Sequence, residues 1–258
     1  MTDNSLKGLH IAITRPRDQS DNLARLIELH GGTPIVFPLI EVVPIDDYTQ
    51  FDHTIQNLDD YNLAIFISTN AVQYAMPRIL NYFPVLPKSM NLAAIGPMTA
   101  NKLNEFGIQN IIVPTMRFDS ESLLALPEMQ NLTNKRIIIV RGLGGRELLA
   151  NRLEEQGAIV DFAECYKRIN PQKDKDTLFV MWQNKKLDAL VVTSSEAMRN
   201  LLDLLPLKSN AWLKEIILFV NNARIAEQPG VSGLNIFVAG APGDESMVEC
   251  LNKNLGAR

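Results

Sequence analysis

Two stretches of the chain share one pattern and decide the fold: HIAITRPRDQSDNLARLIELHG at residues 10–31 and RIIIVRGLGGRELLANRLEEQG at residues 136–157. Each begins as an apolar run, reaches an arginine (Arg15 or Arg141), passes through a polar turn and continues as an amphipathic segment that ends at glycine. This order predicts a buried strand, a tight connection and a helix in both places.

The likeness continues along the chain at a shift of about 126 positions. NLAIFISTNAV (62–72) matches LDALVVTSSEA (187–197), and NLAAIGPMTANKL (91–103) matches EIILFVNNARIA (215–226). A constant shift over most of a chain is the sign of an internal duplication. We therefore expect two related α/β units.

Short apolar runs alternate with helical patterns in both halves. The runs are rich in Ile, Val, Leu, Ala and Phe, which is typical of strands buried on both faces of a parallel sheet. The expected strands are Ile11–Thr14, Ala64–Ser68, Leu92–Ile95, Ile111–Val113, Ile137–Val140, Ala189–Thr193, Ile216–Val220 and Ile236–Val238. The fold class predicted from this alternation is α/β, with two related parallel-sheet lobes.

Two segments break the alternation: FPLIEVVPID at 37–46 and AECYKRINP at 163–171. Both are bounded by proline and neither leads directly into a helix. Proline favours extended geometry in the residue before it, so both segments should run straight. Because they occupy corresponding places in the two halves, we expect them to lie side by side as a hinge.

Composition limits the classes of function. The chain has 258 residues, of which 46% are hydrophobic and 21% charged, and its net charge is −4. It carries no long block of Lys and Arg, so a nucleic-acid partner is not expected. It shows neither a secretory signal at the start nor an apolar run of about 20 residues that would span a membrane.

The cysteines and histidines give no catalytic or metal motif. Cys165 and Cys250 lie far apart without CxxC spacing, which indicates two reduced thiols in a soluble cytoplasmic protein. The three histidines are scattered, with neither HxxxH nor HExxH spacing, so no metal site is expected.

Hydroxyls, amides and glycines gather where strands lead into helices. Ligands of parallel sheets bind beyond the carboxyl ends of the strands, and helix N-termini there attract carboxylates and phosphates. Helix capping alone accounts for any one of these residues, but six such junctions indicate a broad surface for an extended anion. The candidate binding residues are Thr14, Arg15, Ser68, Thr69, Asn70, Gly96, Thr99, Arg141, Gly142, Gly144, Arg146, Thr193, Ser194, Ser195 and Asn222.

The segment VRGLGGRELL is the sharpest of these junctions. It lacks the GxxxxGK[ST] pattern of a P-loop, and Glu147 stands where a dinucleotide fingerprint needs its third glycine. Asp161 lies at about the right distance downstream for a ribose, which is weak support on its own. A nucleotide-dependent enzyme therefore stays a minor alternative.

Tyr166 is an aromatic residue among charged neighbours in the second extended segment. Its hydroxyl is a candidate acid, and packing between the two extended segments explains the same residue equally well. The sequence leaves these two interpretations open.

Several of these motifs together resemble the uroporphyrinogen-III synthase family, especially its bacterial members. They are TRP after the first strand, FISTNAV, AAIGPMTANKL, RIIIVRGLGGRELLANRLEEQGA, AECYKRINP and VVTSSEA. The likeness runs from about residue 8 to the C-terminus. In the last third, VNNARIA stands where some members carry a Gly-Pro-Thr-Thr-Ala-like turn.

The resemblance implies two lobes joined by a two-stranded β-ladder. Lobe one would comprise residues 1–37 and 172–258, lobe two residues 45–162, and the linker strands residues 38–44 and 163–171. It also implies a substrate, the linear tetrapyrrole hydroxymethylbilane, bound in the cleft between the lobes. No cofactor is implied. We expect a monomer with at most transient contact with the preceding enzyme of the pathway.

The family's reaction closes the bilane into uroporphyrinogen III with loss of water and inversion of the last pyrrole through a spiro intermediate. The resemblance places Tyr166 at the connector tyrosine of the family, as the group that helps the hydroxyl to leave. A non-enzymatic two-lobed binding protein is the main alternative, because hinged α/β lobes also clasp ligands.

Overall fold

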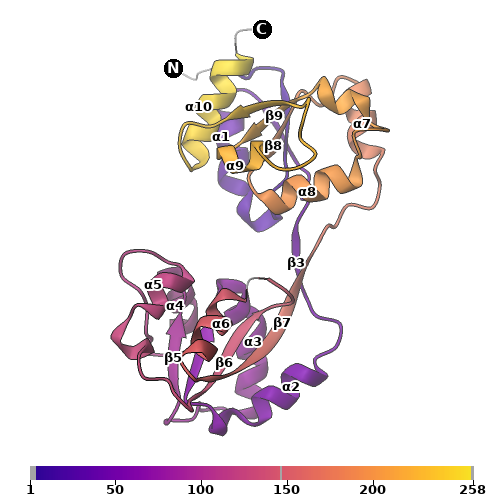
Figure 1. The fold of residues 1–258 in the computed structure, drawn as a ribbon. Coiled ribbons are helices and arrows are strands. Elements are labelled where there is room, and N and C mark those ends of the chain that lie inside the picture. The colour runs from indigo at the N-terminus through magenta and orange to yellow at the C-terminus, as the bar shows by residue number, and fades with distance from the viewer. Residues whose placement is uncertain (1–3, 146, 257–258) are drawn as a thin grey trace. The chain divides into compact units, whose positions relative to one another are not determined.

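The computed structural model describes residues 4–145 and 147–256. The chain divides into two compact units, the first formed by Met1–Glu41 with Ile169–Arg258 and the second by Val42–Arg168. Each unit is built around its own five-stranded sheet (Figure 1). In the described part of the chain, no helix is long and apolar enough to cross a membrane.

The sheet of the first unit has the order β10-β9-β8-β1-β2, and all neighbouring strands are parallel. Helices α1 (Asp21–Leu29) and α10 (Asp244–Leu255) cover one face, and α7 (Thr177–Gln183), α8 (Ser195–Leu204) and α9 (Ala223–Ala226) cover the other. The strands are β1 (His10–Ile13), β2 (Thr33–Val36), β8 (Ala189–Val192), β9 (Ile217–Val220) and β10 (Asn235–Val238).

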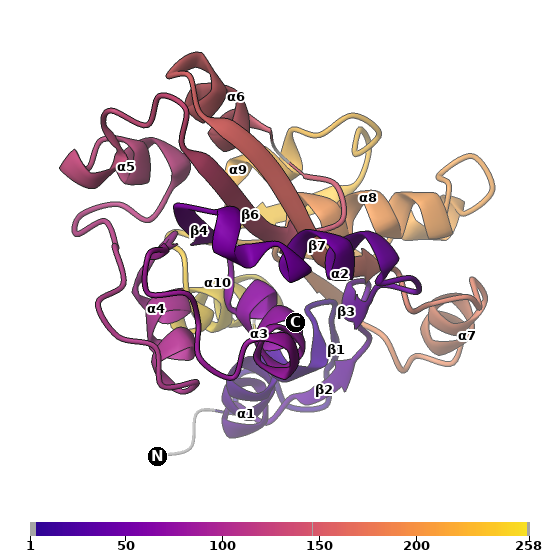
Figure 2. The ribbon, with the colours of Figure 1, turned by 90° about the horizontal axis from the view of Figure 1, so that it is seen from below.

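The sheet of the second unit has the order β3-β7-β6-β4-β5. Its strands are β3 (Glu41–Pro44), β4 (Leu63–Phe66), β5 (Asn91–Ala94), β6 (Arg136–Gly142) and β7 (Ile159–Ile169). Figure 2 shows α5 and α6 on one side of β4, β6 and β7, and α3 and α4 on the other. The helices are α2 (Thr49–Gln56), α3 (Thr69–Tyr82), α4 (Pro97–Asn104), α5 (Ser120–Leu124) and α6 (Leu148–Glu155).

Four strands of each unit occupy matching places. Strands β1 and β2 have counterparts in β6 and β7, and β4 and β5 have counterparts in β8 and β9, each about 126 positions further along the chain. The two sheets therefore contain the same order, β9-β8-β1-β2 in one and β5-β4-β6-β7 in the other. The expected α/β class with parallel sheets is confirmed, and both sheets are buried under helices on two faces.

Most of the expected strands are present, with small shifts of their bounds. The run Ile111–Val113 is an exception, because only Ile112 forms an isolated bridge, with Ala93. Strand β2 escaped the sequence pattern because Pro34 interrupts it; proline is tolerated there because β2 lies at an edge of its sheet. The extended segment 163–171 proves to be the second half of a longer strand, β7.

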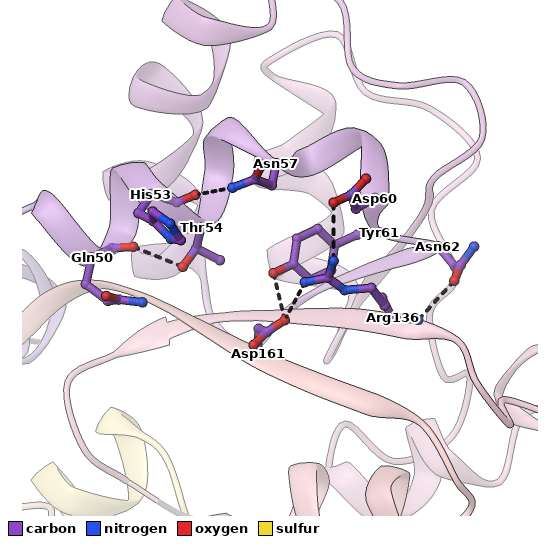
Figure 3. Close-up of polar contacts among 9 residues, drawn as sticks. All are labelled: Gln50, His53, Thr54, Asn57, Asp60, Tyr61, Asn62, Arg136 and Asp161. Atoms are coloured by element: carbon purple, nitrogen blue, oxygen red, sulfur yellow. Dashed lines mark hydrogen bonds and ion pairs between the residues drawn. The ribbon is translucent and has the colours of Figure 1, made fainter.

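A polar cluster anchors the amino ends of β6 and β7 (Figure 3). The Tyr61 hydroxyl donates to Asp161 Oδ2 at 2.8 Å, and the Arg136 guanidinium lies 3.3 Å from the same oxygen and 3.2 Å from Asp60. That guanidinium also lies over the Tyr61 ring, 4.8 Å from its centre. The carboxylate of Asp161 is thus engaged within the fold, which removes the sequence argument for a ribose-binding acid.

The cluster predicts that the free energy of unfolding decreases at alkaline pH. Burial first, and then the bond to Asp161, raises the pKa of Tyr61 from 10.0 to about 12. Folding therefore favours the neutral phenol of Tyr61. The stability that this residue contributes is fully present below about pH 10 and is lost as pH rises toward about 12. We expect the unfolding free energy in urea to fall more steeply over this window in the wild type than in Tyr61→Phe. Equal slopes would contradict this role.

Candidate functional site

Tyr166 lies just beyond an irregularity in the pairing of β7 with β6. Arg141 pairs with Glu164, but the next residue of β6, Gly142, pairs with Tyr166, so Cys165 is an extra residue in β7. Side chains alternate along a regular strand, and an extra residue reverses their order. Cys165 and Tyr166 consequently both enter the core on the α3 face, although regular alternation would put Tyr166 on the face of Glu164.

Hydrogen bonds hold this bulge in place. The single S–H of Cys165 lies within reach of two carbonyl acceptors, that of Arg141 at 3.4 Å and that of Ala71 at 3.6 Å from the sulfur. The Tyr48 hydroxyl donates to the Cys165 carbonyl at 2.8 Å. Burial raises the pKa of Cys165 to about 12, which keeps the sulfur protonated and able to donate. Cys165 is therefore a structural thiol of the bulge.

The Tyr166 side chain is almost completely enclosed, with 3% of its surface exposed. Its ring stacks on Tyr74 with ring centres 5.9 Å apart, and its hydroxyl lies 3.1 Å from Ser68 Oγ. Gly142 lies against the ring so closely that a β-carbon there would be 2.5 Å from Tyr166 Cε2. The glycine is thus required for the position of the ring.

Ser68 joins this tyrosine to the start of α3. Ser68 Oγ accepts a hydrogen bond from Ala71 N at 3.0 Å, which makes Ser68 the N-cap of the helix. Ser68, Thr69 and Asn70 are all half-buried at the carboxyl end of β4. Backbone N–H groups in the first turn of a helix have no partner within the helix, so this end offers donors to an anion.

The end of β5 has a different surface. Gly96 is the N-cap of α4, and Thr99 is buried in its first turn. A β-carbon at Gly96 would lie 2.9 Å from that of Phe118. Phe118 and Met98 are 54% and 76% exposed, so apolar side chains border the glycine. Met98 lies in the junction after β5 but was not chosen as a candidate because its side chain is apolar, and Phe118 was not singled out because it lies far from that junction in the sequence.

The end of β6 is organised by Arg141. Its side chain is buried, lies over the Phe162 ring at 4.7 Å, and donates from Nε to the Gly142 carbonyl at 3.2 Å and from Nη2 to the Gly144 carbonyl. Glu164 accepts from Gly144 N at 3.1 Å. The guanidinium therefore shapes this loop with its own hydrogen bonds.

In the first unit, Arg15 is likewise an arginine held by partners inside the protein, at the end of β1. Arg15 Nε donates to Thr193 Oγ1 at 3.0 Å, and its Nη1 forms an ion pair with Asp244 at 2.5 Å. Asp244 also accepts from Asn22 at 2.8 Å. The Thr14 hydroxyl is buried and donates to a backbone carbonyl of β8. Asp244 was missed in the sequence because more than two hundred residues separate it from Arg15.

The ends of β8 and β9 present two more helix N-termini. Ser194 accepts from Ala197 N at 3.0 Å as the N-cap of α8, which begins at Ser195. Asn222 is the N-cap residue of α9, and its Nδ2 donates to Asn221 at 3.0 Å. Its buried Oδ1 has no partner among the described residues.

The structure thus collects the expected residues at the carboxyl ends of two sheets. The first unit contributes Thr14, Arg15, Thr193, Ser194, Ser195 and Asn222; the second contributes Ser68, Thr69, Asn70, Gly96, Thr99, Arg141, Gly142, Gly144 and Tyr166. Arg146 lies outside the described residues. Among residues 4–145 and 147–256, no group of three or more His, Cys, Asp and Glu side chains is arranged to hold a metal ion.

Comparison with known proteins identifies the family. A family model described as uroporphyrinogen-III synthase HemD matches residues 21–249. The chain belongs to this family. The uroporphyrinogen-III synthase of Escherichia coli K12 is 34% identical over 220 residues, which cover 85% of this chain and 89% of the relative. That of Salmonella typhimurium LT2 is 35% identical over 222 residues, covering 84% and 89%. The resemblance stated from the motifs is confirmed.

Solved structures share the fold. A mutant uroporphyrinogen III synthase from the extremely thermophilic bacterium Thermus thermophilus gives a TM-score of 0.64 at 17% identity, covering 97% of this chain and 100% of the other. The uroporphyrinogen-III synthetase of Helicobacter pylori 26695 gives 0.56 at 17% identity, covering 93% and 97%. At such low identity, these structures support the α/β architecture alone.

The packing of Gly142 under Tyr166 predicts the effect of one methyl group. In Gly142→Ala the β-carbon displaces the tyrosine ring, and we expect turnover to fall by about tenfold or more while the protein stays folded. Gly240→Ala is the matched control, because a β-carbon there meets nothing within 4 Å and Gly240, like Gly142, does not have a positive φ. Equal turnover in both variants would contradict the role of Gly142.

The bulge predicts unequal reactivity of the two thiols. Because the pKa of Cys165 is about 12 and the residue is fully buried, we expect it to resist iodoacetamide at about pH 8 in the folded protein. Cys250, which is half-buried, should react first. Peptide mass spectrometry after timed alkylation distinguishes them; labelling of Cys165 at the rate of Cys250 would be incompatible with the bulge.

Proposed function

We propose that the chain acts as a uroporphyrinogen-III synthase, with substrate-binding loops at the carboxyl ends of the sheet in each unit and with Tyr166 and Ser68 as the reactive pair of the second unit. The enzyme cyclises hydroxymethylbilane to uroporphyrinogen III, with loss of water and inversion of the last pyrrole. The observation that carries the site is the 3.1 Å contact between Tyr166 and Ser68 at the N-terminus of α3. It joins a potential proton donor to one of the expected anion-binding junctions.

The reaction depends more on the orientation of the substrate than on acid–base catalysis. Loss of the terminal hydroxyl gives an azafulvene that the pyrrole nitrogen stabilises. The substituted carbon of the far ring then attacks, forming a spiro intermediate, which fragments and closes again with that ring reversed. Because the free bilane closes spontaneously to the symmetric isomer, the enzyme must hold the chain so that the productive carbon meets the electrophile.

The carboxylates of the substrate are proposed to bind at the helix N-termini. Those of α3, α4 and α8 follow β4, β5 and β8 directly, and each offers first-turn N–H groups and the positive end of a helix dipole. Such sites bind acetate and propionate groups without buried lysines. The exposed side chains of Met98 and Phe118 supply an apolar surface for pyrrole rings beside the N-cap of α4.

The arginines are proposed to act mainly through the loops that they hold. Arg141 bonds the carbonyls of its own loop, and Arg15 is paired with Asp244. Both guanidiniums have an acidic neighbour, Glu164 at 3.9 Å from Arg141 and Asp244 at 2.5 Å from Arg15, so their role in this proposal is to fix the conformation of their loops. Arg146, which lies outside the described residues, stays a candidate for carboxylate binding on its place in the sequence alone.

Several features of the molecule belong to the same proposal. The two units are proposed to derive from one duplicated α/β unit, and β3 with β7 to serve as the linker ladder. We place the enzyme in the cytoplasm as a monomer that needs no cofactor. Any contact with the preceding enzyme of the pathway is transient.

The direct test is the isomer produced from freshly made hydroxymethylbilane. We expect the purified protein to yield the type III isomer, separated from type I by chromatography, and to keep this activity after exhaustive chelation. Activity that disappears on chelation and returns with an added metal would contradict the cofactor-free proposal.

The competing functions predict other outcomes of the same assay. A protein that only binds the bilane would leave the spontaneous rate and the type I isomer unchanged. A nucleotide-dependent enzyme would bind ATP or NAD in an equilibrium titration, which we expect to show no binding.

A further inference from the structure

We propose that Ser68 is the group that touches the departing hydroxyl of the bilane, and that Tyr166 supplies the proton through Ser68. This relay rests on the proposed function of the site. In this proposal Ser68 transfers a proton and does not bind a carboxylate. Tyr166 is buried and supplies the proton without contacting the substrate.

Burial separates the two hydroxyl-bearing residues. Tyr166 is 3% exposed, and its ring is enclosed by Tyr74 on one side and Gly142 on the other. Ser68 is half-buried at the open N-terminus of α3. A substrate that reaches this helix end therefore meets Ser68 before Tyr166.

The donors and acceptors around Ser68 leave room for a relay that runs outward from Tyr166. A serine hydroxyl accepts two hydrogen bonds and donates one. Ser68 Oγ accepts one bond from Ala71 N at 3.0 Å and lies 3.1 Å from the Tyr166 hydroxyl. When Tyr166 donates, both acceptor positions of Ser68 are filled, and its own proton is directed toward the substrate. The neighbouring Tyr74 hydroxyl donates elsewhere, to the Val42 carbonyl at 2.9 Å.

The proton balance closes within one turnover. As the C–O bond of the bilane breaks, Ser68 gives its proton to the departing oxygen, which leaves as water, and takes the proton of Tyr166. The phenolate persists until the ring carbon of the closed macrocycle loses its hydrogen to restore the pyrrole. That proton returns through Ser68 to Tyr166, so no other acid or base is consumed.

The first unit offers a natural comparison. Ser194 caps α8 in the way that Ser68 caps α3, accepting from Ala197 N at 3.0 Å. About 126 positions before Tyr166, the matching place is occupied by Ile40, a buried aliphatic residue. A serine N-cap thus occurs in both units, but only the cap of the second unit, Ser68, has a tyrosine hydroxyl beside it among the matching positions compared. Capping alone does not require Tyr166.

The experiment is a double-mutant cycle on single-turnover rates with hydroxymethylbilane. We expect Ser68→Ala and Tyr166→Phe each to slow the reaction on the order of tens to a hundredfold, with binding little changed. Because both variants break one relay, the double variant should be no slower than either single one. Ser68→Thr keeps both the cap and the hydroxyl and should recover most of the rate.

A second cap separates helix stability from proton transfer. Asp119 caps α5 by accepting from Ser122 N at 2.8 Å, so Asp119→Ala loses a cap as Ser68→Ala does. Asp119→Ala should keep the wild-type rate.

Each alternative outcome overturns the relay. A rate loss in Tyr166→Phe without one in Ser68→Ala would mean that the tyrosine acts directly, and losses that multiply in the double variant would mean independent roles. Wild-type rates in both variants would reduce the pair to packing. A wild-type protein that yields only the type I isomer would remove the reaction itself, and with it the relay.

Discussion

One extra residue in β7 sets the geometry on which the candidate site depends. The irregular pairing after Arg141 places Cys165 and Tyr166 on the same face of the sheet, where α3 lies. In a regular strand, Tyr166 would share the face of Glu164 and its hydroxyl would not reach Ser68. The buried thiol of Cys165 and the Tyr48 hydroxyl hold that residue in the strand. The bulge therefore directs the Tyr166 side chain toward Ser68.

The remaining site residues follow from the doubly covered parallel sheets. Such a sheet brings several helix N-termini to one edge, and their N–H groups bind anions without formal charge. This explains how a chain with a net charge of −4 can recognise a polycarboxylate. In the proposed site, Arg15 and Arg141 hold their loops through partners inside the protein.

Strands and junctions were predictable because their signals are local. Apolar runs such as Ile137–Val140 and the polar residues that follow them can be read directly from the sequence, and the family could be recognised from their order. Strand β2 could not, because Pro34 is acceptable only at an edge, and which strands form the edges depends on the whole sheet. The run Ile111–Val113 resembles a strand locally but makes only one bridge.

The features that give the site its detail depend on partners distant in sequence. Nothing in AECYKRINP indicates the register shift, since it exists only relative to β6. The Ser68–Tyr166 contact spans 98 residues and the Arg15–Asp244 pair spans 229. Residue types were therefore predictable as candidates, whereas the exposure of Ser68 and the burial of Tyr166 required the folded chain.

The most direct test of the account is a crystal structure of the enzyme with an unreactive hydroxymethylbilane analogue that retains the terminal hydroxyl. The account predicts Ser68 Oγ within hydrogen-bonding distance of that hydroxyl, with Tyr166 behind it and bonded to Ser68. A terminal hydroxyl bonded directly to Tyr166, or bound away from the N-terminus of α3, would contradict it.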